Sequence, residues 1–247
     1  MNLKRLYNNN SIINGDCYEE LLKIESNSVD LVLIDPPYII SRDSGFKGIS
    51  ESTSKEMASK YNISIDFGDW DKKELNWEEL FQQYYRILKK GGTLIVFYDI
   101  WKSNELKETA DLVKFKQPRV GCWIKNNPVP INSKTNYLSN ATEYFFSFVK
   151  DKKPTFHSEY DNGFYKYPIC HGKERYEHPT QKPLELMKDL IKKHSNPGDV
   201  VLDSFAGTGT TGHAALLLDR KYILIEKEEK YFEIIKKRLQ EVNKTDI

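Results

Sequence analysis

The sequence has few cysteines and lacks a long apolar run. Its three cysteines, Cys17, Cys122 and Cys170, are odd in number and far apart, which excludes a disulfide framework and leaves no CxxC pair for a structural zinc. No apolar stretch approaches the roughly 20 residues of a membrane span. The N-terminal segment has no apolar region of the kind found in export signals. We therefore expect a cytoplasmic protein without a membrane segment or a metal site.

Net charge is also nearly absent, because 37 Lys and Arg face 36 Asp and Glu and leave a formal charge of +1. This balance conceals a separation along the chain. Residues 112–193 contain 15 basic and 8 acidic residues, a net charge of +7, and the remainder carries −6. A basic stretch interleaved with aromatic residues is typical of a surface that follows nucleic-acid phosphates. A solvated charged face would give the same pattern without a ligand.

Apolar, β-rich runs alternate with amphipathic helical segments, which predicts an α/β protein with a mostly parallel sheet. We expect seven strands, at Ser11–Ile13, Val29–Ile34, Thr93–Tyr98, Arg119–Ile124, Glu143–Val149, Val200–Leu202 and Tyr222–Ile225. The longer expected helices are Leu75–Lys90, ended by Gly91 and Gly92, then Leu184–His194 and Tyr231–Val242. A chain of 247 residues is long enough to give such a sheet a full hydrophobic core.

Two segments interrupt this alternation. Residues 41–71 follow a strand end and are rich in Ser, Gly and charge, which predicts a mobile functional loop. Residues 126–177 are rich in Asn, Lys and aromatics with little periodicity, which predicts an inserted recognition segment. Residues 1–125 and 178–247 are expected to form one domain around these insertions.

A glycine-rich turn joins a short strand to a helix near the C-terminus. Val200–Leu202 leads into Asp203 and then into Ser-Phe-Ala-Gly-Thr-Gly-Thr-Thr-Gly at residues 204–212. Glycine permits positive φ and a close approach of the backbone to a ligand, and the start of the helix offers unpaired N–H groups. Glu226 ends the next strand 19 residues after Gly207, where a carboxylate can accept hydrogen bonds from both hydroxyls of a ribose.

The glycine turn alone fits more than one ligand. Gly207, Gly209 and Gly212 also match the GxGxxG pattern of dinucleotide-binding dehydrogenases, and a tight turn without a ligand is a further reading. However, only one helix follows Glu226, whereas a dinucleotide fold that begins here needs several more βα units. The missing strands must come from the N-terminal part of the chain, which predicts a circularly permuted order.

Asp35, Pro36, Pro37 and Tyr38 directly follow the expected strand Val29–Ile34. The prolines fix φ and remove two N–H donors, so the Asp35 carboxylate and the Pro36 carbonyl present acceptors without a competing donor. Such a pair suits the –NH₂ group of a nucleobase, whose lone pair is delocalised into the ring. Tyr38 offers a ring on which a base can stack, a contact of roughly 1–3 kcal/mol. A stiff turn that leaves a strand is the simpler alternative.

The Asp-Pro-Pro-Tyr segment comes before the Phe-Ala-Gly-Thr-Gly loop in the chain. In this order, the two segments resemble the catalytic and cofactor motifs of the permuted, β-class amino-DNA methyltransferases. The resemblance covers nearly the whole chain apart from the two irregular segments. It implies a circularly permuted Rossmann-like sheet of seven strands with helices on both faces and a small inserted recognition segment. It also implies methyl transfer from S-adenosylmethionine to an exocyclic amine of DNA, with the base flipped out of the duplex or met unpaired.

The resemblance also assigns roles to residues. Asn14-Gly15-Asp16-Cys17 is similar to the segment that contacts the cofactor adenine, and the His-Pro-Thr-Gln-Lys-Pro sequence at 178–183 is similar to the motif that reaches its methionine end. The expected catalytic residues are Asp35, Pro36, Pro37 and Tyr38. The expected cofactor-binding residues are Asp16, Cys17, Asp35, Thr180, Lys182, Asp203, Phe205, Ala206, Gly207, Thr208, Gly209, Thr210, Thr211 and Glu226.

Two positions in the glycine loop depart from the family pattern. Ser204 stands where Pro is usual and Thr208 where Ser or Cys is common, and we expect both to leave the loop intact. Asp35 favours adenine N6 as the methylated amine, since family members that methylate cytosine N4 generally have Ser there. Cytosine N4 is the first alternative. An NAD-dependent oxidoreductase would not explain Asp35, and a non-catalytic DNA-binding protein would explain only the basic stretch.

DNA is the expected partner, bound through the basic stretch. The expected DNA-binding residues are Lys125, Lys134, Lys166, Lys173 and Arg175. A homodimer is compatible with the resemblance, and the sequence leaves open whether a restriction endonuclease partner exists. It contains no readable code for the recognition sequence.

Overall fold

The computed structural model describes residues 10–37, 75–128, 141–176 and 180–245. The described residues 10–36 and 76–245 belong to one compact unit. Eight strands of the described residues form one sheet in the order β1-β8-β7-β2-β3-β5-β4-β6. Their bounds are β1 (Ser11–Asn14), β2 (Val29–Ile34), β3 (Leu88–Phe97), β4 (Lys116–Lys125), β5 (Thr142–Val149), β6 (Phe164–Tyr167), β7 (Val200–Asp203) and β8 (Lys221–Glu226). Only β5 is antiparallel to its neighbours, so the α/β class is confirmed.

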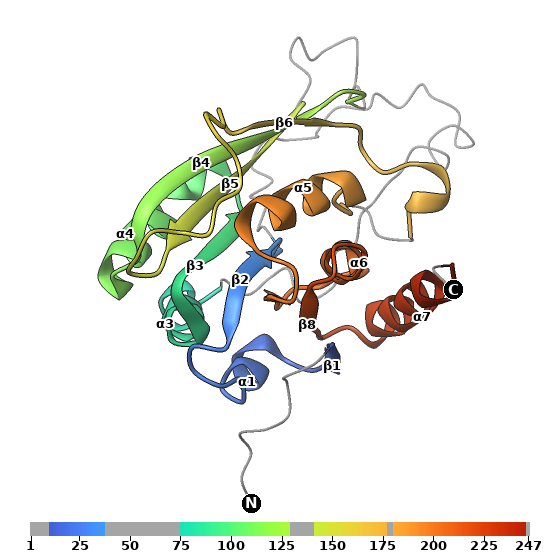
Figure 1. Cartoon of the computed structure of the whole chain (residues 1–247), viewed down its shortest axis with the longest axis horizontal. Coiled ribbons are helices and arrows are strands. Elements are labelled where there is room, and N and C mark those ends of the chain that lie inside the picture. The colour runs from blue at the N-terminus through green and yellow to red at the C-terminus, as the bar shows by residue number, and fades with distance from the viewer. Residues whose placement is uncertain (1–9, 38–74, 129–140, 177–179, 246–247) are drawn as a thin grey trace, which may run out of the picture. The chain divides into compact units, whose positions relative to one another are not determined.

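The helices fall into two groups on either side of the sheet (Figure 1). One group contains α1 (Cys17–Leu21), α3 (Trp77–Ile87) and α4 (Ser103–Val113), and the other contains α5 (Leu184–His194), α6 (Thr210–Leu217) and α7 (Glu229–Thr245). From β7 the chain moves through α6 to β8, toward one edge of the sheet, whereas from β2 it moves through α3 to β3, toward the other. Because crossovers between parallel strands are right-handed, these two directions place α6 and α3 on opposite faces.

The neighbouring strands β2 and β7 therefore mark the point where the winding of the sheet changes direction. Leu31 pairs with Val201 and Val32 with Leu202, so the two strands run parallel and end side by side. Asp35 follows β2, and Asp203 is the last residue of β7. In open α/β sheets, ligands bind at the carboxyl ends of the strands at such a switch point.

The apolar spacing of α3 explains its position against the sheet. Trp77, Leu80, Phe81, Tyr84 and Ile87 lie on one face of the helix and are all buried. Burying each large side chain contributes roughly 1.5–3 kcal/mol. The helix starts after an Asn at 76, whose side chain accepts a hydrogen bond from a backbone N–H of the first turn at 3.2 Å. No helix in the described part of the chain is long and apolar enough to cross a membrane.

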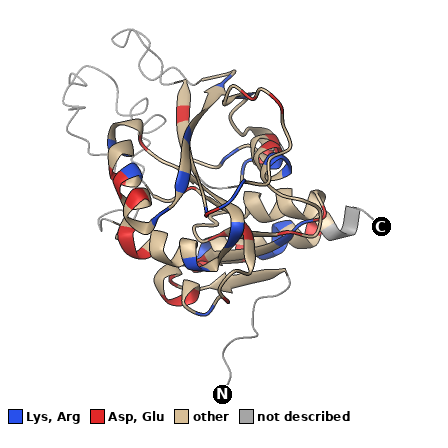
Figure 2. Ribbon diagram, turned by 60° about the vertical axis from the view of Figure 1, so that its left-hand side comes forward, with Lys and Arg blue, Asp and Glu red and all other residues tan. Residues whose placement is uncertain are grey.

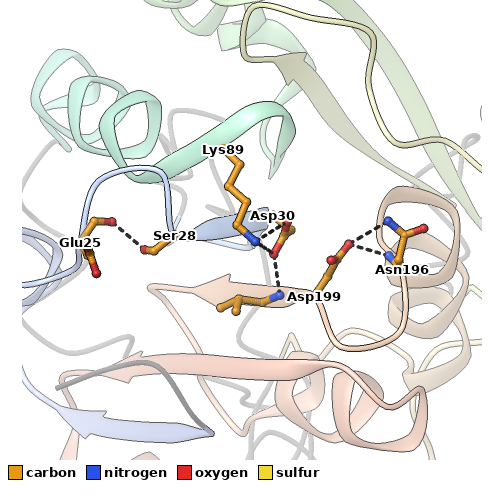
Figure 3. A network of polar contacts seen from close by, with 7 residues as sticks. Glu25, Ser28, Asp30, Lys89, Asn196 and Asp199 are labelled. Atoms are coloured by element: carbon orange, nitrogen blue, oxygen red, sulfur yellow. Dashed lines mark hydrogen bonds and ion pairs between the residues drawn. The ribbon is translucent and has the colours of Figure 1, made fainter. Parts of the chain in front are cut away.

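At the opposite end of the central strands, Asp30 ties β2, β3 and β7 together (Figure 3). Lys89 Nζ lies 2.9 Å and 2.8 Å from the two carboxylate oxygens of Asp30, and the backbone N–H of Val200 donates to Asp30 at 2.9 Å. Just before β7, Asp199 accepts a hydrogen bond from the backbone N–H of Asn196 at 2.7 Å. These contacts fix the register of strands whose far ends carry the expected site.

The expected end of the helix at Gly91 and Gly92 is wrong. Helix α3 ends at Ile87, and both glycines lie inside β3. The backbone N–H of Gly91 donates to the carbonyl of Lys150 at 2.7 Å, and the N–H of Lys150 donates to the carbonyl of Gly92 at 2.9 Å. Gly91 has a φ of +85° at an irregular part of the strand pairing, so glycine serves the sheet here and not the helix cap.

The expected number of seven strands is also too low. β6 lies within residues 126–177 and pairs in parallel with β4, from Cys122 with Phe164 to Lys125 with Tyr167. Its four residues are too few to give a periodic signal, and α1 and α4 were likewise not expected. β5 also lies within these residues, so the segment 126–177 contributes two strands to the sheet. The expected loop at 41–71 lies outside the described residues.

Candidate active site

Asp203 lies at the centre of the candidate site, buried at the end of β7. Its carboxylate accepts hydrogen bonds from the hydroxyl of Thr211 at 2.5 Å and from the backbone N–H of Phe205 at 3.0 Å. Burial raises the pKa of Asp203 to about 7 despite these hydrogen bonds, and the nearby charges of Asp35 and Glu226 act in the same direction. Asp35 and Glu226 therefore lie near enough to Asp203 to influence its charge.

The glycine loop between β7 and α6 has the backbone conformation that its sequence predicts. Gly207 and Gly209 have φ values of +52° and +78°, in the region that favours glycine. A Cβ on Gly209 would lie 3.0 Å from the side chain of Ile235 on α7, so that helix packs tightly against the loop. The backbone N–H of Gly207 donates to Glu226 at 2.7 Å.

Ser204 has a hydrogen-bonding partner that the more usual proline could not have. The hydroxyl of Tyr84 on α3 lies 2.6 Å from Ser204 Oγ, and both side chains are buried. This contact joins the glycine loop to the helix on the opposite face of the sheet. It explains how the loop accommodates serine at this position.

Arg238 holds the other side of the loop, a role that the sequence did not reveal. Its side chain is fully buried, and one guanidinium nitrogen lies 3.2 Å from the carbonyl of Thr208 and 3.0 Å from Thr210 Oγ1. The guanidinium carbon is 4.7 Å from the centre of the Tyr176 ring. The available signal was an arginine on the face of α7 that also carries the buried residues 235 and 239.

Glu226 ends β8 beside the segment that was expected to contact a cofactor. Besides Gly207, its carboxylate accepts a hydrogen bond from the backbone N–H of Glu228 at 2.8 Å. Burial raises the pKa of Glu226 to about 7. The backbone N–H of Gly15 donates to the Glu226 carbonyl at 3.0 Å, which places the start of the Asp16-Cys17 segment next to Glu226. Asp16 caps α1, and Cys17 is buried.

Asp35 belongs to a row of four charged side chains of alternating sign, Asp35, Lys182, Glu143 and Lys125. Lys182 Nζ lies 2.5 Å from Asp35 Oδ2 and 3.1 Å from Glu143 Oε2, and Lys125 Nζ lies 2.8 Å from Glu143 Oε1. Burial acts to lower the pKa of Lys182, but the two carboxylates outweigh it and raise that pKa above its usual value. Burial likewise acts to raise the pKa of Glu143, and the two ammonium groups hold it below its usual value. The sequence did not single out Glu143, which stands in a mostly apolar strand.

The rest of the segment before α5 connects the glycine loop with residues 172–176. Gln181 Oε1 accepts a hydrogen bond from the backbone N–H of Tyr176 at 3.1 Å and from Thr208 Oγ1 at 3.2 Å. Its amide donates to the carbonyl of Glu174 at 2.7 Å. Thr180 is exposed. The expected site residues on this segment therefore differ, since Lys182 contacts Asp35 and Thr180 faces solvent.

The expected DNA-binding residues are not equivalent. Lys166 and Arg175 are exposed, whereas the ammonium of Lys125 is paired with Glu143. Lys134 and the side chain of Lys173 lie outside the described residues, as does Tyr38. Figure 2 shows basic and acidic positions interspersed on the same helices. Within residues 112–193, Lys182 is paired with Asp35, an acid from outside this stretch, whereas the Lys125–Glu143 pair is already counted in its net charge of +7.

The residues at the switch point fit the nucleoside cofactor that the resemblance implies. A carboxylate at the tip of β8 suits a ribose diol, and the positive-φ glycines remove side chains from the loop. The buried carboxylate of Asp203 suits a positively charged group. Within the described ranges, no group of three or more His, Cys, Asp and Glu side chains could hold a metal ion.

Comparisons with known proteins agree with this geometry. Residues 29–237 match the model of a DNA methylase family, the N6/N4 methylases. The Type II methyltransferase M.HinfI of Haemophilus influenzae is 33% identical over 261 residues, which cover 96% of this chain and 71% of that protein. The Type II methyltransferase M2.MboI of Moraxella bovis is 32% identical over 257 residues, 95% of this chain and 89% of that protein. The crystal structure of the M1.HpyAVI–SAM complex is 27% identical, with a TM-score of 0.69 and coverage of 93% of this chain and 98% of that chain.

Proposed function

Because this chain belongs to the N6/N4 DNA methylase family, we propose that its active site is the switch point between β7 and β2 and that the amine it methylates is adenine N6. The protein is a DNA methyltransferase that uses S-adenosylmethionine. The position of Asp35 carries the proposal. Its carboxylate follows β2 at the same edge as the glycine loop and lies near enough to Asp203 to influence its charge.

The cofactor-binding part of this proposal rests on the glycine loop and on two carboxylates. S-adenosylmethionine, when bound, supplies a methyl group on a positively charged sulfur. Glu226 accepts hydrogen bonds from the ribose hydroxyls, and the backbone of residues 205–211 encloses the ligand. Asp203 provides the negative charge that favours a cationic ligand. Asp16 and Cys17 lie beside Glu226, where the adenine ring would be bound.

The amine-binding part rests on Asp35 and the two prolines after it. Asp35 and the carbonyl of Pro36 accept the two hydrogens of the amine, which frees its lone pair from the ring and directs it toward the methyl group. Pro37 keeps this turn rigid, and Tyr38 stacks on the base. Much of the rate acceleration then comes from orientation, because aligned reacting groups can avoid roughly 7–11 kcal/mol of the barrier.

The proposed contacts with DNA lie on the segment 126–177. We take residues 126–177 as the target-recognition segment, with the exposed Lys166 and Arg175 as contacts to DNA phosphates. Two relatives are named Type II methyltransferases, which supports a restriction endonuclease partner of the same system.

Mass spectrometry of nucleosides from treated DNA tests the function directly. Plasmid DNA incubated with the protein and S-adenosylmethionine should contain N6-methyladenine, and methylome sequencing should place it in one short sequence. N4-methylcytosine in its place would overturn the choice of base. DNA without any added methyl group would overturn the proposed activity.

S-adenosylmethionine should bind more tightly as the pH rises from about 6 to about 8. Asp203 and Glu226 each have a pKa of about 7, so both change from mostly protonated to mostly ionised over this range. A cationic ligand prefers the ionised carboxylates. If binding requires the ionised form, each carboxylate changes the dissociation constant by up to about tenfold. Calorimetry in buffers of different ionisation enthalpy would measure both the trend and the protons released.

Asp203→Asn is the matched variant, because it keeps the size of the side chain and removes one titrating group. Its pH dependence should be flatter than that of the wild type. The stability of the protein without cofactor should depend on pH in the opposite direction. Carboxyls of the unfolded chain have a pKa of about 4, so the contribution of these two groups to stability falls as the pH rises from about 4 to about 7. A dissociation constant that does not vary with pH would contradict the role of the two ionised carboxylates.

A further inference from the structure

Lys182 lies between two carboxylates from different strands, and only one of them belongs to the proposed amine site. Asp35 follows β2, and Glu143 is the second residue of β5. The side chain of Lys182 is only 4% exposed, compared with 20% for Asp35 and 26% for Glu143. A buried ammonium needs compensating negative charge, and here two carboxylates provide it.

Other contacts restrict where the Lys182 ammonium can lie. The ring of Phe97, at the end of β3, lies with its centre 5.0 Å from Nζ. Lys125, at the end of β4, holds the outer oxygen of Glu143 at 2.8 Å. Glu143 and Lys125 come from antiparallel neighbours, so the sheet fixes the position of Glu143. The ammonium is therefore located by the sheet and not by Asp35 alone.

Because the Lys182 ammonium is shared by two carboxylates, Asp35 keeps more of its capacity to accept a hydrogen bond from an amine. If the Lys182 ammonium were paired with Asp35 alone, its positive charge would act on that carboxylate only. The Asp35 carboxylate would then be a weaker hydrogen-bond acceptor for an incoming amine. A second carboxylate draws on the same charge and holds the ammonium in place while Asp35 accepts another hydrogen bond. A carboxylate has about four lone-pair sites, so Asp35 can bind Lys182 and an amine together.

We propose that Glu143 is a positioning residue for methyl transfer, which acts through Lys182 on the Asp35 carboxylate. The inference rests on the proposed role of Asp35 in binding the amine. It assigns Lys182 to the amine side of the site, whereas the sequence motif predicted contact with the cofactor. Glu143 touches neither ligand in this arrangement, and its effect comes from where it keeps Lys182.

Glu143→Gln is the decisive variant, because it removes the charge and keeps the shape. Single-turnover methyl transfer at saturating DNA and S-adenosylmethionine should slow by about 10- to 100-fold, the scale of a small misplacement of a reacting group. The dissociation constant for S-adenosylmethionine, measured by calorimetry, should stay within about twofold of the wild type. Glu143→Asp keeps the charge and should restore part of the rate.

Asp30→Asn provides the matched control. Asp30 forms an ion pair with Lys89 at 2.8 Å (Figure 3), and its side chain is 17% exposed. It is the second residue of β2, whereas Asp35 follows the other end of that strand. The variant should lower the melting temperature without slowing single-turnover transfer. An equal loss of rate in Asp30→Asn and Glu143→Gln would overturn the proposal, because general destabilisation would then explain both.

A measurement without cofactor or DNA tests the same link. Lysine ammonium signals in ¹H–¹⁵N spectra persist when exchange with water is slow, and the Lys182 signal can be assigned by its loss in Lys182→Arg. Glu143→Gln should broaden or shift this signal, and Asp30→Asn should leave it unchanged. The inference would be overturned if Glu143→Gln left the Lys182 signal unaltered or transferred methyl groups at the wild-type rate. It would also be overturned if Glu143→Gln lowered the affinity for S-adenosylmethionine as much as it lowered the rate. If the wild type transfers no methyl group, the proposed function fails instead, and the spectra still test the contact.

Discussion

Replacing Asp35 with Ala is expected to lower the rate of methyl transfer to DNA by about 10³-fold or more, a loss comparable with removing a group aimed at the reacting atoms. The side chain supplies one of the two proposed acceptors for the amine, and the carbonyl of Pro36 supplies the other. Single-turnover transfer of a tritiated methyl group would measure the effect. Calorimetry should show that the dissociation constant for S-adenosylmethionine changes by less than about tenfold.

Asp35→Asn separates the acceptor from the charge. It keeps one carbonyl oxygen and similar size, but it removes the negative charge that lies 2.5 Å from the Lys182 ammonium. We expect a rate between those of the wild type and Asp35→Ala, with a lower melting temperature because a buried ammonium loses one partner. Wild-type transfer by Asp35→Ala would show that the Asp35 side chain does not bind the amine, and wild-type transfer by Asp35→Asn would show that a neutral acceptor is sufficient.

The parts of the site that the sequence predicted are those coded by contiguous residues. The glycine loop and the Asp35 turn each follow a strand, and the order of strands in a parallel sheet brings such ends to one edge. Glu226 could be predicted because a single helix separates its strand from the loop. In each of these cases a local pattern and a general rule of topology were sufficient.

The parts that were missed depend on contacts between distant segments. Lys182 was expected at the site, but its contact with Glu143 was not, because that contact depends on the place of β5 between β3 and β4 in the sheet. Arg238 reaches the glycine loop from the last helix. At Gly91, the pairing of β3 with residue 150 outweighed the usual preference of glycine for helix ends. Tertiary hydrogen bonds decided the local structure there.

Glu226→Ala is expected to weaken S-adenosylmethionine binding by about 10- to 100-fold, since hydrogen bonds to a charged group contribute roughly 1.5–3 kcal/mol. Calorimetry near pH 8 is the appropriate measurement, because the pKa of Glu226 is about 7 and the wild-type side chain is then ionised. The rate of transfer at saturating cofactor should change much less than the affinity.

A structural effect of the same substitution has to be separated from a lost ribose contact. Glu226 also accepts hydrogen bonds from the backbone N–H groups of Gly207 and Glu228, so alanine could loosen the glycine loop. A ligand analogue without the ribose hydroxyls distinguishes the two effects in a double-mutant type of cycle. If Glu226 binds the ribose, the analogue should bind wild type and Glu226→Ala with nearly equal affinity. If the substitution weakens the analogue as much as the natural cofactor, Glu226 acts by holding the loop and the ribose assignment is wrong.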